Sequence, residues 1–237
     1  MEKPFAHLLK PLLAVSVFAV SMGFLESAVV VYLREIYYPT GFAFPLTPLA
    51  PHIASTELFR ELATLVMLLG IGYFAGHNFS TRFAWFIYTF ALWDIFYYIF
   101  LKLLLNWPET LFTFDILFLV PTAWFGPVIA PVIVSISMIM LALAVVTKDF
   151  RNEPAAPDKT EWAMLISGSV VLILAFVWDF SRFFLEKYPW QKLFFLPGNN
   201  LLFRSVQDFV PCNFNWPLFI MAQGVIFLAI ARYLYRK

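Results

Sequence analysis

The stretch LWDIFYYIFLK, residues 92–102, places one carboxylate, Asp94, among apolar and aromatic residues, and one cation, Lys102, eight residues later. It belongs to the run 83–105, which carries no other charged side chain. A helix needs about 20 mostly apolar residues to cross a bilayer. The run therefore predicts a membrane-spanning helix with a carboxylate near its centre.

The composition of the whole chain is typical of a membrane protein. Of its 237 residues, 62% are hydrophobic and only 13% are charged, whereas soluble domains average about 25% charged residues. The formal net charge of +1 provides no basic field for binding nucleic acid. The single cysteine excludes an internal disulfide and any multi-cysteine metal or redox centre within the chain.

Five more segments are long and apolar enough to span a membrane. The six predicted spans are residues 11–33, 57–76, 83–105, 125–147, 162–184 and 215–235. Two apolar segments, 110–120 and 200–210, are too short to span and predict interfacial or re-entrant helices. The predicted fold is an all-α, polytopic transmembrane helix bundle that forms a single integral membrane domain, residues 1–237.

An acid followed eight residues later by a base occurs three times along the chain. The pairs are Glu26 and Arg34, Asp94 and Lys102, and Asp179 and Lys187. An aromatic residue and a proline follow each pair. The recurrence predicts three helical hairpins as internal repeats, residues 11–76, 83–147 and 162–235, with a polar cytoplasmic linker at 148–161.

The positions of Lys and Arg predict the orientation, because cytoplasmic loops are enriched in these residues. One side of the predicted topology carries Lys3, Lys10, Arg82, Lys148, Arg151, Lys159, Arg232, Arg236 and Lys237; the other carries Arg34, Arg60, Lys102, Arg182, Lys187, Lys192 and Arg204. The second set lies largely within helices or against them rather than in free loops. We therefore expect both termini in the cytoplasm and the protein in the cell (inner) membrane.

The acids within the spans are the main candidates for function, because a charge inside a bilayer is costly and usually marks a site. Asp94 lies near the centre of its span, and Glu26 and Asp179 lie in the outer halves of theirs. Tyr97 and Tyr98 follow Asp94 by three and four residues. They therefore share its helical face, where their hydroxyls could donate to the carboxylate.

A second polar cluster begins the second span. Glu57 and Glu61 share a helical face with Arg60 beside it, and Arg182 follows Asp179 closely enough to pair with it. The full candidate set for substrate binding or proton coupling is Glu26, Arg34, Glu57, Arg60, Glu61, Asp94, Tyr97, Tyr98, Lys102, Asp179 and Arg182. The alternative interpretation is structural: these groups satisfy one another and hold the helices together.

Metal and cofactor chemistry has little support in the sequence. The acids of the second span with Glu26, Asp94 and His52 form a conceivable carboxylate-rich metal site. No E-x-x-H or H-E-x-x-H spacing accompanies them. The three histidines lie outside the predicted spans, so a haem inside the membrane lacks axial ligands. We expect neither a metal nor a cofactor.

Three classes of function fit these residues. The first is transport of a small polar or charged solute, with the acids serving proton coupling or substrate contact. The second is a membrane-embedded enzyme acting on a lipid or lipid-linked substrate at the outer leaflet, with Arg34, Arg60 and Lys102 holding a phosphate or carboxylate. The third is a non-catalytic subunit of a membrane complex. The sequence leaves the substrate and the oligomeric state open.

Overall fold

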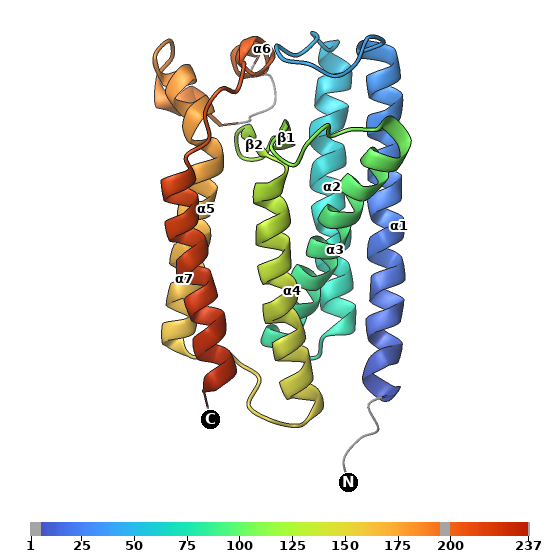
Figure 1. Cartoon of the computed structure of the whole chain (residues 1–237), viewed down its shortest axis with the longest axis vertical. Coiled ribbons are helices and arrows are strands. Elements are labelled where there is room, and N and C mark those ends of the chain that lie inside the picture. Colours follow the sequence, from blue (N-terminus) through green and yellow to red (C-terminus); the bar gives the residue numbers. More distant parts are fainter. Residues whose placement is uncertain (1–5, 195–199, 237) are drawn as a thin grey trace.

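A bundle of long helices makes up most of the chain, whose computed structural model describes residues 6–194 and 200–236 (Figure 1). The long helices are α1 (Ala6–Tyr37), α2 (Pro51–Ala75), α3 (Phe79–Leu105), α4 (Ile129–Phe150), α5 (Lys159–Leu185) and α7 (Trp216–Tyr235). All six are long and apolar enough to cross a membrane. The prediction of six spans is confirmed, and the chain is an integral membrane protein.

Residues 110–120 differ from the prediction, because they form no helix. Phe114–Phe118 is a strand, β1, which pairs antiparallel with β2, Trp124–Pro127. Beyond the strand, the Glu61 carboxylate accepts hydrogen bonds from the backbone N–H groups of Leu119 at 2.9 and 3.0 Å and of Val120 at 3.1 Å. Non-helical backbone is tolerated within a membrane protein where such partners satisfy it. Glu61 is remote in sequence from this segment, so the local apolar pattern could not reveal that contact.

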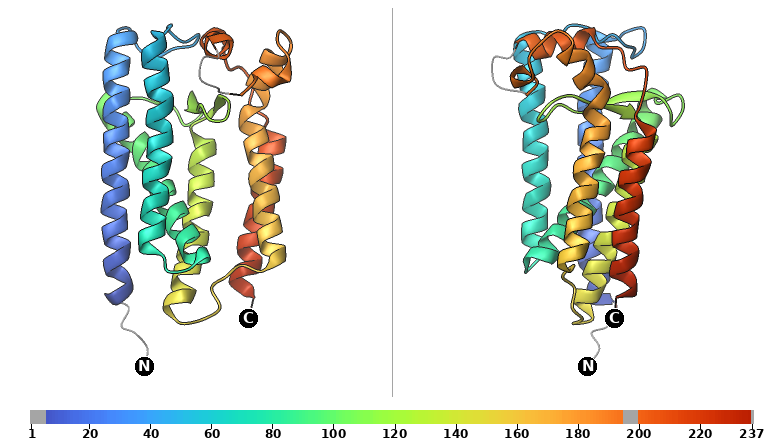
Figure 2. Two further views of the ribbon diagram at one scale, coloured as in Figure 1. Left: turned by 180° about the vertical axis from the view of Figure 1, so that it is seen from behind. Right: turned by 90° about the vertical axis from the view of Figure 1, so that its left-hand side faces the viewer.

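The short helix predicted at 200–210 is confirmed as α6, Asn200–Asp208. It lies across the end of the bundle opposite the first turn of α1 and the last turn of α7 (Figures 1 and 2). Another short element, the 3₁₀ helix η1 (Trp190–Lys192), precedes it. Both belong to the irregular layer that covers this end of the molecule.

Helix α3 is the centre of the larger part of the bundle. It packs against α1, α2 and α4, while α5 pairs with α7 and β2 packs on α5. Two glycines bring α2 close to α3: a Cβ added at Gly72 would lie 2.7 Å from the carbonyl oxygen of Arg82, and one at Gly76 would lie 2.4 Å from its backbone nitrogen. Helix α4 packs on α3 and α7 packs on α5, and the three helical hairpins as internal repeats stay a prediction.

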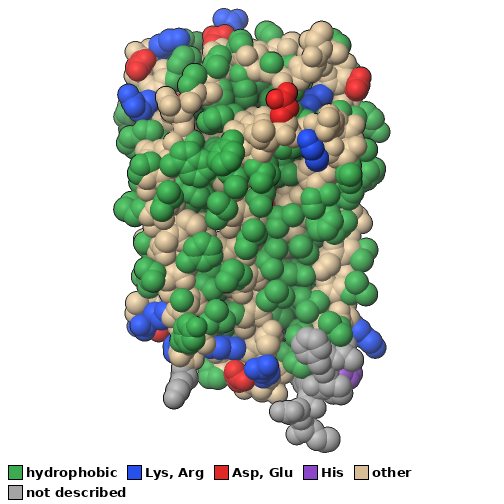
Figure 3. Space-filling model, viewed as in Figure 1, with side chains coloured by type: hydrophobic (Ala, Val, Ile, Leu, Met, Phe, Trp, Pro, Cys, Tyr) green, Lys and Arg blue, Asp and Glu red, His purple; other side chains and the backbone are tan. Residues whose placement is uncertain are grey.

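The surface has the distribution of side chains that a membrane requires. On the face shown in Figure 3, Lys, Arg, Asp and Glu gather toward the two ends, and hydrophobic side chains cover the middle. The helix bounds place Lys10, Arg82, Lys148 and Arg232 at the end where α1 begins. Lys3 and Lys237 lie outside the described residues. The cytoplasmic location of this end stays a prediction.

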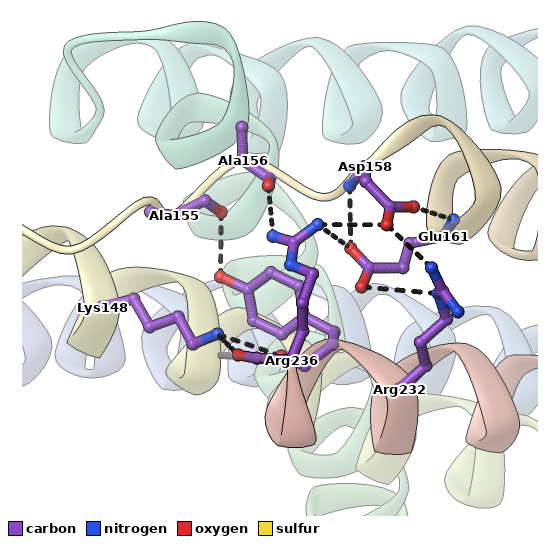
Figure 4. Close-up of polar contacts among 8 residues, drawn as sticks. Lys148, Ala155, Ala156, Asp158, Glu161, Arg232 and Arg236 are labelled. Carbon is purple, nitrogen blue, oxygen red and sulfur yellow. Dashed lines mark hydrogen bonds and ion pairs between the residues drawn. The ribbon is translucent and has the colours of Figure 1, made fainter.

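At that same end, a network of ionic hydrogen bonds ties α5 to α7 (Figure 4). Asp158 caps α5 by accepting from the Glu161 N–H at 2.8 Å, and Arg232 Nη2 donates to Asp158 Oδ2 at 3.1 Å. These two interactions, led by the bond from the Glu161 backbone, lower the pKa of Asp158 to about 2. Arg236 pairs with the fully buried Glu161 at 2.8 Å. Every group named has a partner, so this network is structural.

Candidate functional site

A cavity of about 220 Å³ lies between α1, α2 and α3, in the half of the bundle away from the chain termini. The C-terminal half of α1, the N-terminal half of α2, the middle of α3 and strand β1 form its walls. Residues of the 38–49 loop and of α6 also line it. The Leu46 N–H donates to the Gln207 carbonyl oxygen at 3.0 Å, which joins the loop to α6 over the cavity.

Three carboxylates from three different helices line the cavity. Glu26 lies 11 residues before the end of α1, Asp94 lies 11 before the end of α3, and Glu61 lies 10 after the start of α2. At a rise of about 1.5 Å per residue, these positions are roughly 15–17 Å from the helix ends. Glu26, Glu61 and Asp94 therefore lie about a third to two fifths of the way along their helices from the end that carries the cavity.

Arg60 joins α1 to α2 across the cavity. Its Nη1 pairs with Glu26 of α1, and its Nη2 pairs with Glu57, one turn earlier in α2, at 2.8 Å. The Thr64 hydroxyl donates to the other oxygen of Glu26 at 3.2 Å. Glu26 is only 6% exposed, so these contacts provide most of the compensation for its burial. Glu26, Glu57 and Arg60 form the arginine bridge.

Arg34 occupies an aromatic sandwich at the other side of the cavity. The centre of its guanidinium group lies 3.8 Å from the Trp107 ring and 4.3 Å from the Phe42 ring. Its ionic partner is Asp115 of β1, at 3.7 Å. Among the described residues, no hydrogen-bond acceptor contacts Arg34 Nη1. This guanidinium is therefore fixed in position and incompletely satisfied.

Asp115 is the site residue that the sequence interpretation missed. It is 3% exposed and accepts a hydrogen bond from the Tyr98 hydroxyl at 3.4 Å. Burial raises the pKa of Asp115 to about 6, although the Arg34 guanidinium opposes the rise. The available signal was the lone acid in the otherwise apolar stretch FDILF, residues 114–118, because a carboxylate among apolar residues is costly to bury.

Asp94 lines the cavity, but its hydrogen-bond donor differs from the one expected. The Ser135 hydroxyl of α4 donates to Asp94 Oδ2 at 2.8 Å, and Tyr98 bonds to Asp115 instead. Tyr97 also lines the cavity and lies within electrostatic range of Asp94, Asp115 and both arginines. No cation pairs with Asp94 among the described residues.

Of the remaining predicted site residues, one lines the cavity and three lie outside it. Glu61 lines the cavity while holding the backbone at the end of β1. Lys102 is exposed and donates to the carbonyl oxygens of Asn106 and Pro108 at 3.3 and 2.9 Å, so it caps α3. Asp179 and Arg182 do not line the cavity and form no ion pair among the described residues. The predicted pairing of Asp179 with Arg182 is therefore wrong.

The structure thus brings together eight of the eleven predicted residues and adds Asp115. Those eight are Glu26, Arg34, Glu57, Arg60, Glu61, Asp94, Tyr97 and Tyr98. In the described part of the chain, no three His, Cys, Asp or Glu side chains are grouped as metal ligands. No protein-family model, curated protein or solved structure matches this chain. What bears on function is therefore the cavity itself.

Proposed function

We propose that the protein transports a small polar or charged solute, which binds in the cavity between α1, α2 and α3. The observation that supports this proposal is the gathering of ionisable groups around an open space that reaches about a third to two fifths of the way along the spanning helices. The acids are Glu26, Glu57, Glu61, Asp94 and Asp115, and the bases are Arg34 and Arg60. Ionisable groups inside a membrane protein are costly to bury and by default mark a site for a solute or ion.

The pairing of these groups is uneven, which favours a binding site over purely structural ion pairs. Arg60 is bound by two carboxylates. Arg34, in contrast, contacts its one carboxylate at 3.7 Å, beyond the about 2.7–2.9 Å of a charge-assisted hydrogen bond. Asp94 has a serine as its partner. A network selected only for stability would be expected to satisfy its buried charges.

The arginine bridge offers a way to open the cavity. Helices α1 and α2 both pack on α3, and the bridge connects them to each other. A solute that competes for Glu26 or Arg60 would weaken this connection and allow the two helices to separate. Movement of packed helices around a fixed site is a common basis of alternating access.

The test is solute-driven proton movement in proteoliposomes that contain a pH-sensitive dye. Pools of amino acids, amines and carboxylic acids are added outside, and internal acidification is followed. We expect at least one pool to acidify wild-type vesicles beyond protein-free vesicles, and Asp94→Asn to abolish that signal. Asp179→Asn is the matched control, because Asp179 lies outside the cavity. Equal signals from wild-type and Asp94→Asn vesicles would contradict the coupling role.

A second candidate is a membrane-embedded enzyme that binds a lipid headgroup. The cavity lies between α1 and α2, and this position favours such an enzyme. The two helices contact each other across the cavity through polar side chains, since Arg60 and Thr64 of α2 both bind Glu26 of α1. A headgroup could enter between such helices from the bilayer. Mass spectrometry of lipid that copurifies with wild-type protein and not with Arg60→Met would favour this candidate over transport.

A further inference from the structure

Two ionisable groups of opposite type, one basic and one acidic, line the same cavity with an incomplete set of partners. Arg34 has a side chain that is 9% exposed, an ionic partner at 3.7 Å and an Nη1 without a hydrogen-bond acceptor among the described residues. Asp94 is 7% exposed and has Ser135 as its hydrogen-bond donor. Burying an ionised group without a full set of partners is costly, so each of these groups gains from a ligand of the opposite charge.

The aromatic sandwich suits Arg34 to holding an anionic group. Trp107 and Phe42 fix the guanidinium plane by contacts of 3.8 and 4.3 Å. A guanidinium fixed in this way loses little conformational entropy when its N–H groups bind a carboxylate or phosphate in a forked arrangement. Trp93 adds an indole N–H that lacks a partner among the described residues, and its side chain also lines the cavity.

A ligand with a single charge would leave one side of the cavity unsatisfied. An anion would meet Arg34 but would lie near an excess of carboxylates, five against two arginines. A cation would meet Asp94 but would leave Arg34 as it is. A zwitterion satisfies both groups at once and adds no net charge to the membrane interior, where net charge is costly.

The size of the cavity restricts the ligand further. Its volume of about 220 Å³ is below the about 300–1,000 Å³ of sites for drug-sized ligands. Aromatic and aliphatic side chains such as Tyr37, Phe118 and Leu33 cover much of the remaining wall. The space therefore suits a compact molecule that carries its two charges close to a small apolar portion.

We propose that the cavity binds a small zwitterion, with its anionic group on Arg34 and its ammonium group toward Asp94. This inference rests on the proposed function and specifies the solute class. Two sources share the chemistry: a free α-amino acid, and the ethanolamine headgroup of a lipid, in which a phosphate replaces the carboxylate.

The test is ligand-dependent thermal stability of the purified full-length protein in detergent. Glycine, alanine, leucine and phenylalanine are compared with the carboxylic acids that lack their amino groups and the amines that lack their carboxylates. Phosphoethanolamine, and micelles containing phosphatidylethanolamine or phosphatidylglycerol, test the lipid source. We expect at least one zwitterion to raise Tm and its two single-charge analogues to have no such effect.

Variants at Arg34 identify the group that holds the anion. Arg34→Lys keeps the positive charge but loses the two parallel N–H donors of the guanidinium group. It should weaken binding of the zwitterion that stabilises the wild-type protein roughly tenfold to a hundredfold. Arg34→Met combined with Asp115→Asn removes both members of the pair, so that no buried carboxylate is stranded, and should abolish the shift in Tm. Lys102→Met is the control, because Lys102 is an exposed cap of α3 outside the cavity.

Three results would overturn the inference: an amine or a carboxylic acid that stabilises the protein as well as the zwitterion does, a zwitterion shift that persists without Arg34, or no shift with any zwitterion, free or lipid. If a variant does not fold, the comparison of ligands on the wild-type protein still decides. Proteoliposome uptake separates this inference from transport. If only a single-charge analogue is taken up, the zwitterion is not the ligand but the protein is still a transporter. If a zwitterion binds but is not taken up, the transport proposal is refuted and the zwitterion inference stands.

Discussion

Removal of Arg60 should destabilise the protein strongly, because it leaves Glu26 without its cation. Glu26 is 6% exposed and retains the hydrogen bond from Thr64 as its remaining compensation. Removing one partner of a buried ion pair typically costs about 3–5 kcal/mol. The Arg60 side chain is 26% exposed, which favours the lower end of that range. We therefore expect Arg60→Met to lower the free energy of unfolding by about 3 kcal/mol.

The assay is thermal unfolding in detergent at neutral pH, followed by the fluorescence of the eight tryptophans. For a chain of this size, about 3 kcal/mol corresponds to a fall in Tm of roughly 6–12 °C. Glu26→Gln in the Arg60→Met background keeps an acceptor for Thr64 and removes the stranded charge. This double variant should recover about 2 kcal/mol of the loss, because removing both partners of a buried pair is far less costly than removing one.

Arg182→Met is the matched control, since Arg182 is exposed and has no ion pair among the described residues. Its effect should stay within about 0.5 kcal/mol, as for most surface substitutions. The reasoning is refuted if Arg60→Met costs no more than this control, or if the double variant is no more stable than Arg60→Met alone. Either result would mean that Arg60 does not compensate a buried charge on α1.

Three further results are expected. Gly76→Ala should lower the free energy of unfolding by about 1–3 kcal/mol, because its Cβ would meet the α3 backbone at 2.4 Å. Gly70→Ala is the control and should not destabilise the protein, since nothing lies within 4 Å of its Cβ; equal losses of stability in the two variants would contradict the close approach of α2 to α3. The pKa of Asp115 is raised from 3.8 to about 6, so the stability that its protonated carboxyl contributes is full below about pH 3.8 and is lost as the pH rises through 6. The Tm of Asp115→Asn relative to wild type should therefore rise between about pH 4.5 and 7.5. An unchanged difference in Tm would contradict the raised pKa. Cys212, the single cysteine, is exposed in the segment between α6 and α7. A membrane-impermeant maleimide should therefore label the wild-type protein in intact cells and should not label Cys212→Ser. Labelling of the wild-type protein only after lysis would reverse the predicted orientation.

Part of the site could be predicted from sequence because a carboxylate in an apolar run is conspicuous. Asp94 and Glu26 stand out in this way, and the three-residue and four-residue spacings within α2 correctly grouped Glu57, Arg60 and Glu61. What spacing could not show is which groups meet. Tyr98 shares a helical face with Asp94, yet its hydroxyl reaches Asp115, because packing of β1 against α3 places another acceptor within its range.

The six spanning helices of this membrane protein could be predicted without a structure, because the length and apolarity of a span are local properties imposed by the thickness of the bilayer. Tertiary structure alone decided that Asp115 joins the cavity and that Asp179 stays outside it. It also decided that residues 114–118 form a strand. Their backbone groups pair with β2, which follows closely in sequence. The backbone just after the strand is held by Glu61 of α2, a contact that only the folded bundle brings about.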